Sequence, residues 1–202
     1  MRKVFRIFGV IALAAGIIFS MAACNTDGDD GGVTELKFTN VQVYTTSDGF
    51  SFTPFTGSMA VTSDVGGSGS ISNGRLSFTI GEPSRLTGGA GAFPADWGVS
   101  VSPSNAQAVR LVLNNNMLGN IDGAMTSATS GWQQSVHFYY VDIDCTVTVG
   151  ARAGIRTETT LRLNQGWNAI ISRSESAATA AGYTEVFSVG GLSSGRWAVF
   201  PE

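Results

Sequence analysis

Charged residues are scarce in this 202-residue chain, because Asp, Glu, Lys and Arg make up only 13% of it, against about 25% in a typical soluble domain. Coiled coils and long helical proteins need many more Glu and Lys residues, so that class is excluded. The chain has 12 Lys and Arg residues in all, too few for the basic surface that nucleic acid requires. The net charge of -3 is likewise too small for a charged, disordered tail.

Histidine and cysteine are nearly absent: the chain has one histidine, His137, and two cysteines, Cys24 and Cys145. Zinc sites usually take their ligands from several Cys and His residues, so we expect no zinc site and no cofactor. His137 begins an alternating apolar segment, and we predict a hydrogen-bonded histidine at the edge of the core. Cys145 falls on the apolar positions of the same segment, which predicts a small, buried hydrophobic side chain.

What the chain does have is an export signal. Arg2, Lys3 and Arg6 give a basic start, residues 8–21 form an almost uncharged apolar run, and two alanines precede Cys24. This order of features is typical of a secretory signal peptide. The run has about 14 residues, fewer than the ~20 that a helix needs to span a bilayer.

The cleavage region Met21-Ala22-Ala23-Cys24 resembles the lipobox of bacterial lipoproteins. Met21 stands where leucine is commonest, a looser pattern similar to that of spirochaete lipoproteins. The resemblance implies that residues 1–23 are cleaved and that Cys24 becomes the acylated first residue, bound to the membrane through palmitate-like chains. In enteric lipoproteins an Asp after the Cys retains the protein in the inner membrane, so Asn25 favours the outer membrane. The alternative is an ordinary secretory signal in which Cys24 is incidental.

Residues 24–32 contain no apolar side chain after Cys24 and predict a flexible tether, ~30 Å long when extended and ~15 to 18 Å as a coil. The spacing within residues 27–32 is also that of a calcium-binding loop, but the loop's final glutamate would be Phe38. We therefore favour a solvated tether. Loss of the signal leaves nine basic residues against 15 acidic ones, a net charge of -6.

Residues 33–202 predict a single all-β domain. In residues 136–149 the odd positions from Tyr139 onward are apolar and Asp or Thr residues alternate with most of them, which predicts one long strand with one buried face. Similar alternation elsewhere gives about ten strands. We predict an antiparallel β-sandwich, with an up-and-down or lipocalin-like barrel as the alternative.

Turn signals separate these strands. Asn73-Gly74 predicts a type I′ hairpin, and residues 164–166 predict a second tight hairpin. The apolar phase changes near Asn40, which indicates a β-bulge. The helix candidates are residues 174–181, between a Ser cap and a Gly, and a turn within residues 117–130.

The candidate ligand-binding residues are those predicted to lie on the outer face of the long strand: Phe138, Tyr140, Asp142 and Asp144. Residues two apart lie ~6.5 to 7 Å from each other on one face. A pair of carboxylates beside an aromatic platform suits a sugar ligand. The other interpretation is a polar outer face whose aromatic side chains are covered. The sequence Gly191-Leu192-Ser193-Ser194-Gly195 matches the hydrolase pattern G-x-S-x-G, but no acid-histidine pair follows it, so we predict a turn there.

These observations leave different classes of function open. The first is a non-catalytic, lipid-anchored envelope protein that acts as a binding or structural module, with a glycan or a protein as its partner. The second is an enzyme acting on glycans through Asp142 and Asp144. The third is a carrier that holds a small ligand inside a barrel. An enzyme would need a cleft with two convergent carboxylates in unequal environments.

Overall fold

A computed structural model describes most of the chain beyond the predicted tether. Residues 1–33 lie outside the described part, and so do the predicted cleavage site, Cys24, the tether and the turn at 191–195. The described residues are 34–45, 53–115, 119–121, 124–126, 133–176, 179–190 and 197–199. Within these ranges, no helix has the length and apolar content needed to cross a membrane.

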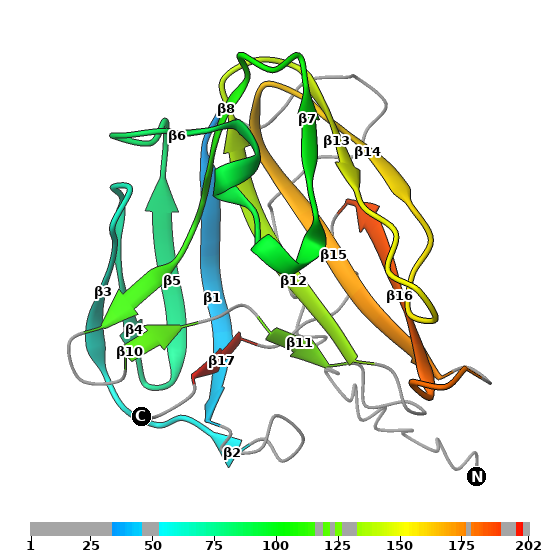
Figure 1. Cartoon of the computed structure of the whole chain (residues 1–202). Coiled ribbons are helices and arrows are strands. Elements are labelled where there is room, and N and C mark those ends of the chain that lie inside the picture. Colours follow the sequence, from blue (N-terminus) through cyan, green and yellow to red (C-terminus); the bar gives the residue numbers. More distant parts are fainter. Residues whose placement is uncertain are drawn as a thin grey trace, which may run out of the picture.

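The described residues form three β-sheets (Figure 1). The large sheet contains, in spatial order, β10 (Gly119–Ile121), β9 (Leu113–Asn115), β3 (Met59–Ser63), β4 (Ser68–Ser72), β5 (Arg75–Ile80), β1 (Leu36–Thr45) and β17 (Trp197–Val199), with β2 (Thr53–Pro54) also paired to β1. The central sheet contains β16 (Tyr183–Val189), β15 (Gly166–Ser176), β12 (Gln133–Val141), β8 (Gln107–Arg110) and β6 (Thr87–Gly88), with β11 (Ala124–Thr126) also paired to β12. The small sheet contains β14 (Thr159–Leu163), β13 (Cys145–Val149) and β7 (Ser100–Ser102).

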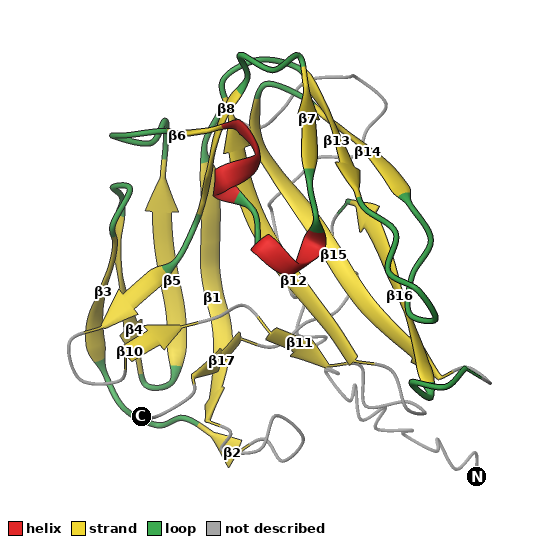
Figure 2. Ribbon diagram, viewed as in Figure 1, coloured by secondary structure: helices red, strands yellow, loops and turns green. Residues whose placement is uncertain are grey.

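The predicted all-β class is confirmed. Every described pairing between strands is antiparallel except that of β1 with β17. Helical structure in the described residues consists of two 3-10 turns, η1 (Gly89–Ala92) and η2 (Ala95–Trp97), drawn red in Figure 2. The described residues form 17 strands, more than the predicted ten or so, and ten of them have four residues or more. The barrel alternative is wrong, because the sheets are open layers.

The central sheet is covered on both faces, so the layers enclose two cores. The first core lies between the large and central sheets and contains Leu36, Phe38, Val41, Val43, Val61, Val65, Ile71, Leu76, Phe78, Ile80, Val109, Leu111, Leu113, Val136, Phe138, Tyr140, Trp167 and Ala169. The second core lies between the central and small sheets and contains Phe93, Trp97, Ala106, Ala108, Tyr139, Val141, Cys145, Val147, Val149, Leu161, Leu163, Ile170 and Phe187. Neighbouring residues of β12 and β15 therefore point into different cores.

Two local features of the large sheet agree with the sequence. The register between β1 and β5 shifts between Phe38 and Val41, which confirms the predicted irregularity near Asn40. The β4–β5 hairpin turns at Asn73 and Gly74, with φ of 50° and 74°. Positive φ at both central residues is the geometry of a type I′ turn, so this prediction is also confirmed.

The predicted helix at residues 174–181 is wrong, because the described residues 174–176 are strand and residues 179–181 form a bend and turn. Residues 174–176 belong to β15, where Ser174 pairs with Gln133 on one side and Glu185 on the other. Both neighbours offer ladder hydrogen bonds to the backbone, and this outweighs the weak helical signal of a Ser-rich segment. Residues 119–121 and 124–126, inside the second helix candidate, are the short strands β10 and β11.

The predicted long strand is divided in two by a bend. β12 ends at Val141 and β13 begins at Cys145, and each belongs to a different sheet. On the partner side, β14 ends at Leu163 and β15 begins at Gly166. The two ladders form one ribbon in which residues 142–144 oppose residues 164–165. The extra residue on one side resembles a β-bulge, a common way for strands to pass from one layer to another.

This bend also corrects the second predicted hairpin. β14 pairs with β13, whereas β15 pairs with β12 and β16. The turn at residues 164–166 therefore carries the chain from the small sheet to the central one. Its turn-forming sequence was a correct signal of a change in direction, but it did not show which strands become partners.

Candidate functional site

The two candidate carboxylates lie in the bend. The backbone N–H of Gln107 donates to Asp142 Oδ1 at 2.7 Å, and the N–H of Asp142 donates to the Gln107 carbonyl at 3.1 Å. Asp144 Oδ1 accepts a hydrogen bond from the N–H of Gln165 at 2.7 Å. Each carboxylate thus ties the bend to a different segment, so both have a structural role.

Asn168 fastens the other side of the bend. Its Nδ2 donates to the carbonyls of Asn164 at 2.8 Å and Gly166 at 2.9 Å, and its Oδ1 accepts from the N–H of Asn164 at 3.1 Å. The residue is 6% exposed. A buried amide with three partners satisfies backbone groups that the ladders leave unpaired where they change sheets. Nothing in the sequence distinguishes Asn168 from the other asparagines of the chain.

The predicted exposed aromatic platform is wrong. Phe138 and Tyr140 are 4% and 7% exposed and belong to the first core. Phe138 contacts Phe38 edge to face at a ring-centroid distance of 5.2 Å, and Tyr140 contacts Trp167 in the same way at 5.5 Å. The large sheet covers the face of β12 that was predicted to be exposed, so these rings cannot stack on a sugar. The glycan-hydrolase hypothesis therefore loses its aromatic platform.

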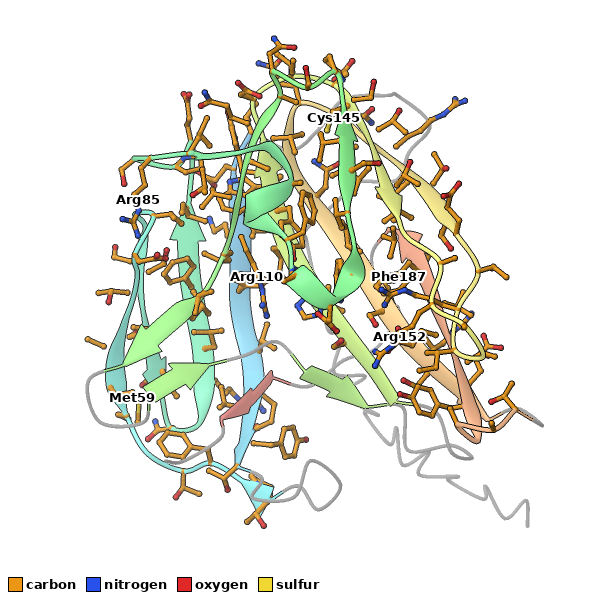
Figure 3. All side chains as sticks on the ribbon, viewed as in Figure 1. Met59, Arg85, Arg110, Cys145, Arg152 and Phe187 are labelled. Atoms are coloured by element: carbon orange, nitrogen blue, oxygen red, sulfur yellow. The ribbon has the colours of Figure 1, made fainter. Side chains whose placement is uncertain are left out.

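Cys145 lies at the start of β13 beside the same bend (Figure 3). It is 7% exposed, which confirms the predicted buried position. Burial, together with the charges of Asp142 and Asp144, raises the pKa of its thiol. A raised pKa keeps the thiol protonated at neutral pH, whereas a nucleophilic cysteine needs a lowered one.

His137 lies at the edge of the second core. Its Nε2 is 3.1 Å from Ser135 Oγ, and its ring meets Trp97 edge to face at 5.3 Å. This confirms the predicted hydrogen-bonded histidine at the core edge. Burial, and secondarily the charge of Arg110, lowers the pKa of His137 from 6.5 to about 4. The imidazole is therefore neutral at physiological pH.

The lowered pKa of His137 predicts a pH-dependent stability. The unfolded chain protonates His137 below about pH 6.5 and the folded chain only below about pH 4, so stability is lost as the pH falls through this window. The full difference corresponds to roughly 3 kcal/mol. His137→Gln removes the titration but keeps a hydrogen-bonding group. Urea unfolding between pH 7 and pH 4 should therefore show a flatter profile for this variant than for the unaltered chain, and identical profiles would contradict the assignment.

A second prediction concerns the stability that the carboxylates of Asp142 and Asp144 give to the bend. Asp142→Ala and Asp144→Ala each remove an acceptor from a backbone N–H, and we expect each to lower the free energy of unfolding by about 1 kcal/mol. Asn at the same position keeps an acceptor oxygen, so Asp142→Asn and Asp144→Asn should cost less. If the Asn variants were as unstable as the Ala variants, charge and not hydrogen bonding would be the stabilising factor.

Arg156 forms the second polar cluster that the sequence did not predict. Its side chain is 3% exposed, and it contacts Glu185 at 2.8 Å and the Gly150 carbonyl at 2.8 Å. It also donates to the Asp96 carbonyl and lies over the Phe187 ring. These contacts join the loop after β13 to η2 and to β16, near the region where Figure 3 labels Phe187.

The described residues show no cluster of metal-ligating side chains, since no three His, Cys, Asp or Glu side chains among them are placed to hold a metal ion. The polar side chains that are buried, Arg156 and Asn168, bond mainly to backbone carbonyls. The candidate site is thus the bend at one end of the sandwich, where Asp142, Asp144 and Asn168 hydrogen-bond to the backbone.

Comparison with known proteins adds no family to this description. No protein-family model, no curated protein and no solved structure matches the chain.

Proposed function

We propose that this chain is a lipid-anchored protein of the bacterial cell envelope and that its β domain is a non-catalytic binding or structural module. The observation that carries the proposal is the lipobox-like sequence Met21-Ala22-Ala23-Cys24 after a basic start and an apolar run. A permanent anchor needs more than one acyl chain, and modification of Cys24 on its sulfur and its amino group supplies several. Asn25 supports the outer membrane as the destination.

The non-catalytic part of the proposal rests on the roles of the reactive side chains. Asp142 and Asp144 accept backbone hydrogen bonds, His137 is neutral, and the Cys145 thiol has a raised pKa. Enzymes place such groups together with their pKa values shifted toward neutrality. Here they are distributed between a bend and a core edge, and each stabilises its own surroundings.

Mass spectrometry of the membrane fraction tests the anchor. We expect a mature chain that begins at Cys24 and carries acyl chains, and it should sediment with the outer membrane in a density gradient. Cys24→Ser should be released from the membrane, whereas Cys145→Ser, which changes the other cysteine, should stay bound. An unacylated Cys24, or a Cys24→Ser variant bound as firmly as the unaltered protein, would refute the proposal.

Thermal unfolding of residues 33–202 in the presence of sugars, peptidoglycan fragments and fatty acids tests the binding role. A ligand of the native state stabilises it by ~2.7 kcal/mol at a hundredfold excess over Kd. A shift in Tm would identify the class of ligand, and its absence for all three classes would favour a protein partner or a structural role. Hydrolysis of any of the glycans would contradict the non-catalytic assignment.

A further inference from the structure

One end of the sandwich carries the start of the described chain, and we name it the bend end. Here Leu36 pairs with Ile80. The carbonyl of Gly81, which follows Ile80, accepts a hydrogen bond from Trp167 Nε1 at 2.8 Å. Trp167 follows Gly166, whose partner across the ladder is Val141, the last residue before the bend. The start of β1 and the bend therefore lie at the same end, the upper end in Figure 1.

The opposite end, the hairpin end, carries the β4–β5 turn at Asn73 and Gly74 and the last residues of β1. Thr45 pairs there with Thr53, and Val43 pairs with Trp197. Contacts of β17 with β11 join the large and central sheets at this end. β1 runs the whole distance between the two ends, and its ten residues span about 30 Å.

We infer that the bend end faces the lipid bilayer and that the hairpin end is presented away from it. This inference rests on the proposed anchoring through Cys24. Eleven residues lie between Cys24 and Leu36, and for the flexible tether that the sequence predicts this length corresponds to a typical span of ~18 Å. That distance is shorter than the length of β1, so the tether keeps the bend end nearer to its point of attachment than the hairpin end.

The charge of the bend end determines how it meets the lipid. Five acidic side chains lie there against three cations, Lys37, Arg85 and Arg162, and Arg85 pairs with Asp64 at 2.7 Å. The other four acidic residues are Glu35, Glu82, Asp142 and Asp144. Adsorption to anionic lipid requires an excess of basic residues. The bend end is therefore held near the bilayer by the tether alone and does not adhere to anionic headgroups.

Energy transfer to labelled lipid tests the orientation in the full, acylated chain. With Cys145→Ala as background, a donor dye is attached at Gln165→Cys on the bend end or at Ser72→Cys beside the hairpin turn, both exposed positions. The protein is bound to phosphatidylcholine vesicles with an acceptor dye on the headgroups. We expect a greater loss of donor emission at position 165 than at position 72. Equal losses, or a greater loss at position 72, would overturn the inference.

Two controls separate the possible causes. A long Gly-Ser insertion after Gly32 should reduce the difference between the two positions, because the longer tether no longer restricts which end is near. Anionic vesicles at low salt should weaken the emission loss at position 165, and high salt, which shortens the Debye length to ~3 Å at 1 M, should restore it. A stronger loss on anionic vesicles would show that the bend end is attracted to them. It would overturn the inference that the tether alone holds this end near the bilayer.

Failure of the orientation and failure of the anchor give different results. Protein that floats with the vesicles but shows the reverse order of emission losses retains the anchor and refutes the orientation. Protein that lacks acyl chains and does not float refutes the proposed function, and the orientation with it.

Discussion

Replacing Arg156 with methionine should lower the free energy of unfolding by about 3 kcal/mol, the range measured when one partner of a buried ion pair is removed. The side chain is 3% exposed and bonds to Glu185, to the Gly150 carbonyl and to the Asp96 carbonyl. Methionine fills much of the volume but donates no hydrogen bond. Glu185, whose side chain is 18% exposed, would then be a largely buried carboxylate without its cation.

Urea unfolding of residues 33–202, followed by circular dichroism, measures this effect. Arg152→Met is the matched control: Arg152 is exposed in the same loop, and surface changes usually stay within about 0.5 kcal/mol. The double change Arg156→Met with Glu185→Gln should recover part of the lost stability, because it also removes the unpaired negative charge of Glu185. Equal losses for the Arg156 and Arg152 variants would show that the buried cluster contributes nothing.

Trp167→Ala should have a comparable or larger effect, a loss of about 4 kcal/mol, typical of removing a buried tryptophan. Trp167 is 1% exposed and fills the first core beside Tyr140. Its Nε1 also donates to the Gly81 carbonyl at 2.8 Å, which links the central sheet to the end of β5. The variant therefore loses both core volume and a bond between two layers.

Trp167→Phe separates these two contributions. It keeps an aromatic ring in the core but loses the hydrogen bond to Gly81, and we expect a loss of about 1 to 2 kcal/mol. Val189→Ala serves as the control on the neighbouring strand, since Val189 is 41% exposed. Circular dichroism is again the suitable signal, because Trp167 itself contributes to fluorescence. A Phe variant as unstable as the Ala variant would assign most of the effect to the bond between layers.

The alternation of apolar residues determined more of the fold than any other signal. It predicted the buried positions of Tyr139, Val141 and Cys145, and all three lie in the second core. The Asn73-Gly74 pair predicted its hairpin because few other residues adopt positive φ at both turn positions. These features depend on local backbone geometry, which neighbouring residues encode directly.

The candidate site was harder to predict because it depends on which layers meet. Alternation shows that a strand has two faces, but Phe138 and Tyr140 lie on the second face of a strand covered on both sides. Their aromatic character was compatible with either an exposed platform or a core. Only the position of the large sheet, whose strands come from a distant part of the sequence, decides between the two.

The sequence by itself determined the β-rich class, the turn at Asn73-Gly74, the burial of Cys145 and the lipobox-like signal that supports the proposed anchor. The tertiary structure alone decided that there are three layers, that Asp142 and Asp144 hold a bend, and that Arg156 and Asn168 are buried polar anchors. The physical reason is the range of the interactions. Side-chain period and turn geometry are set within a few residues, whereas the stacking of sheets depends on contacts between segments that are remote along the chain.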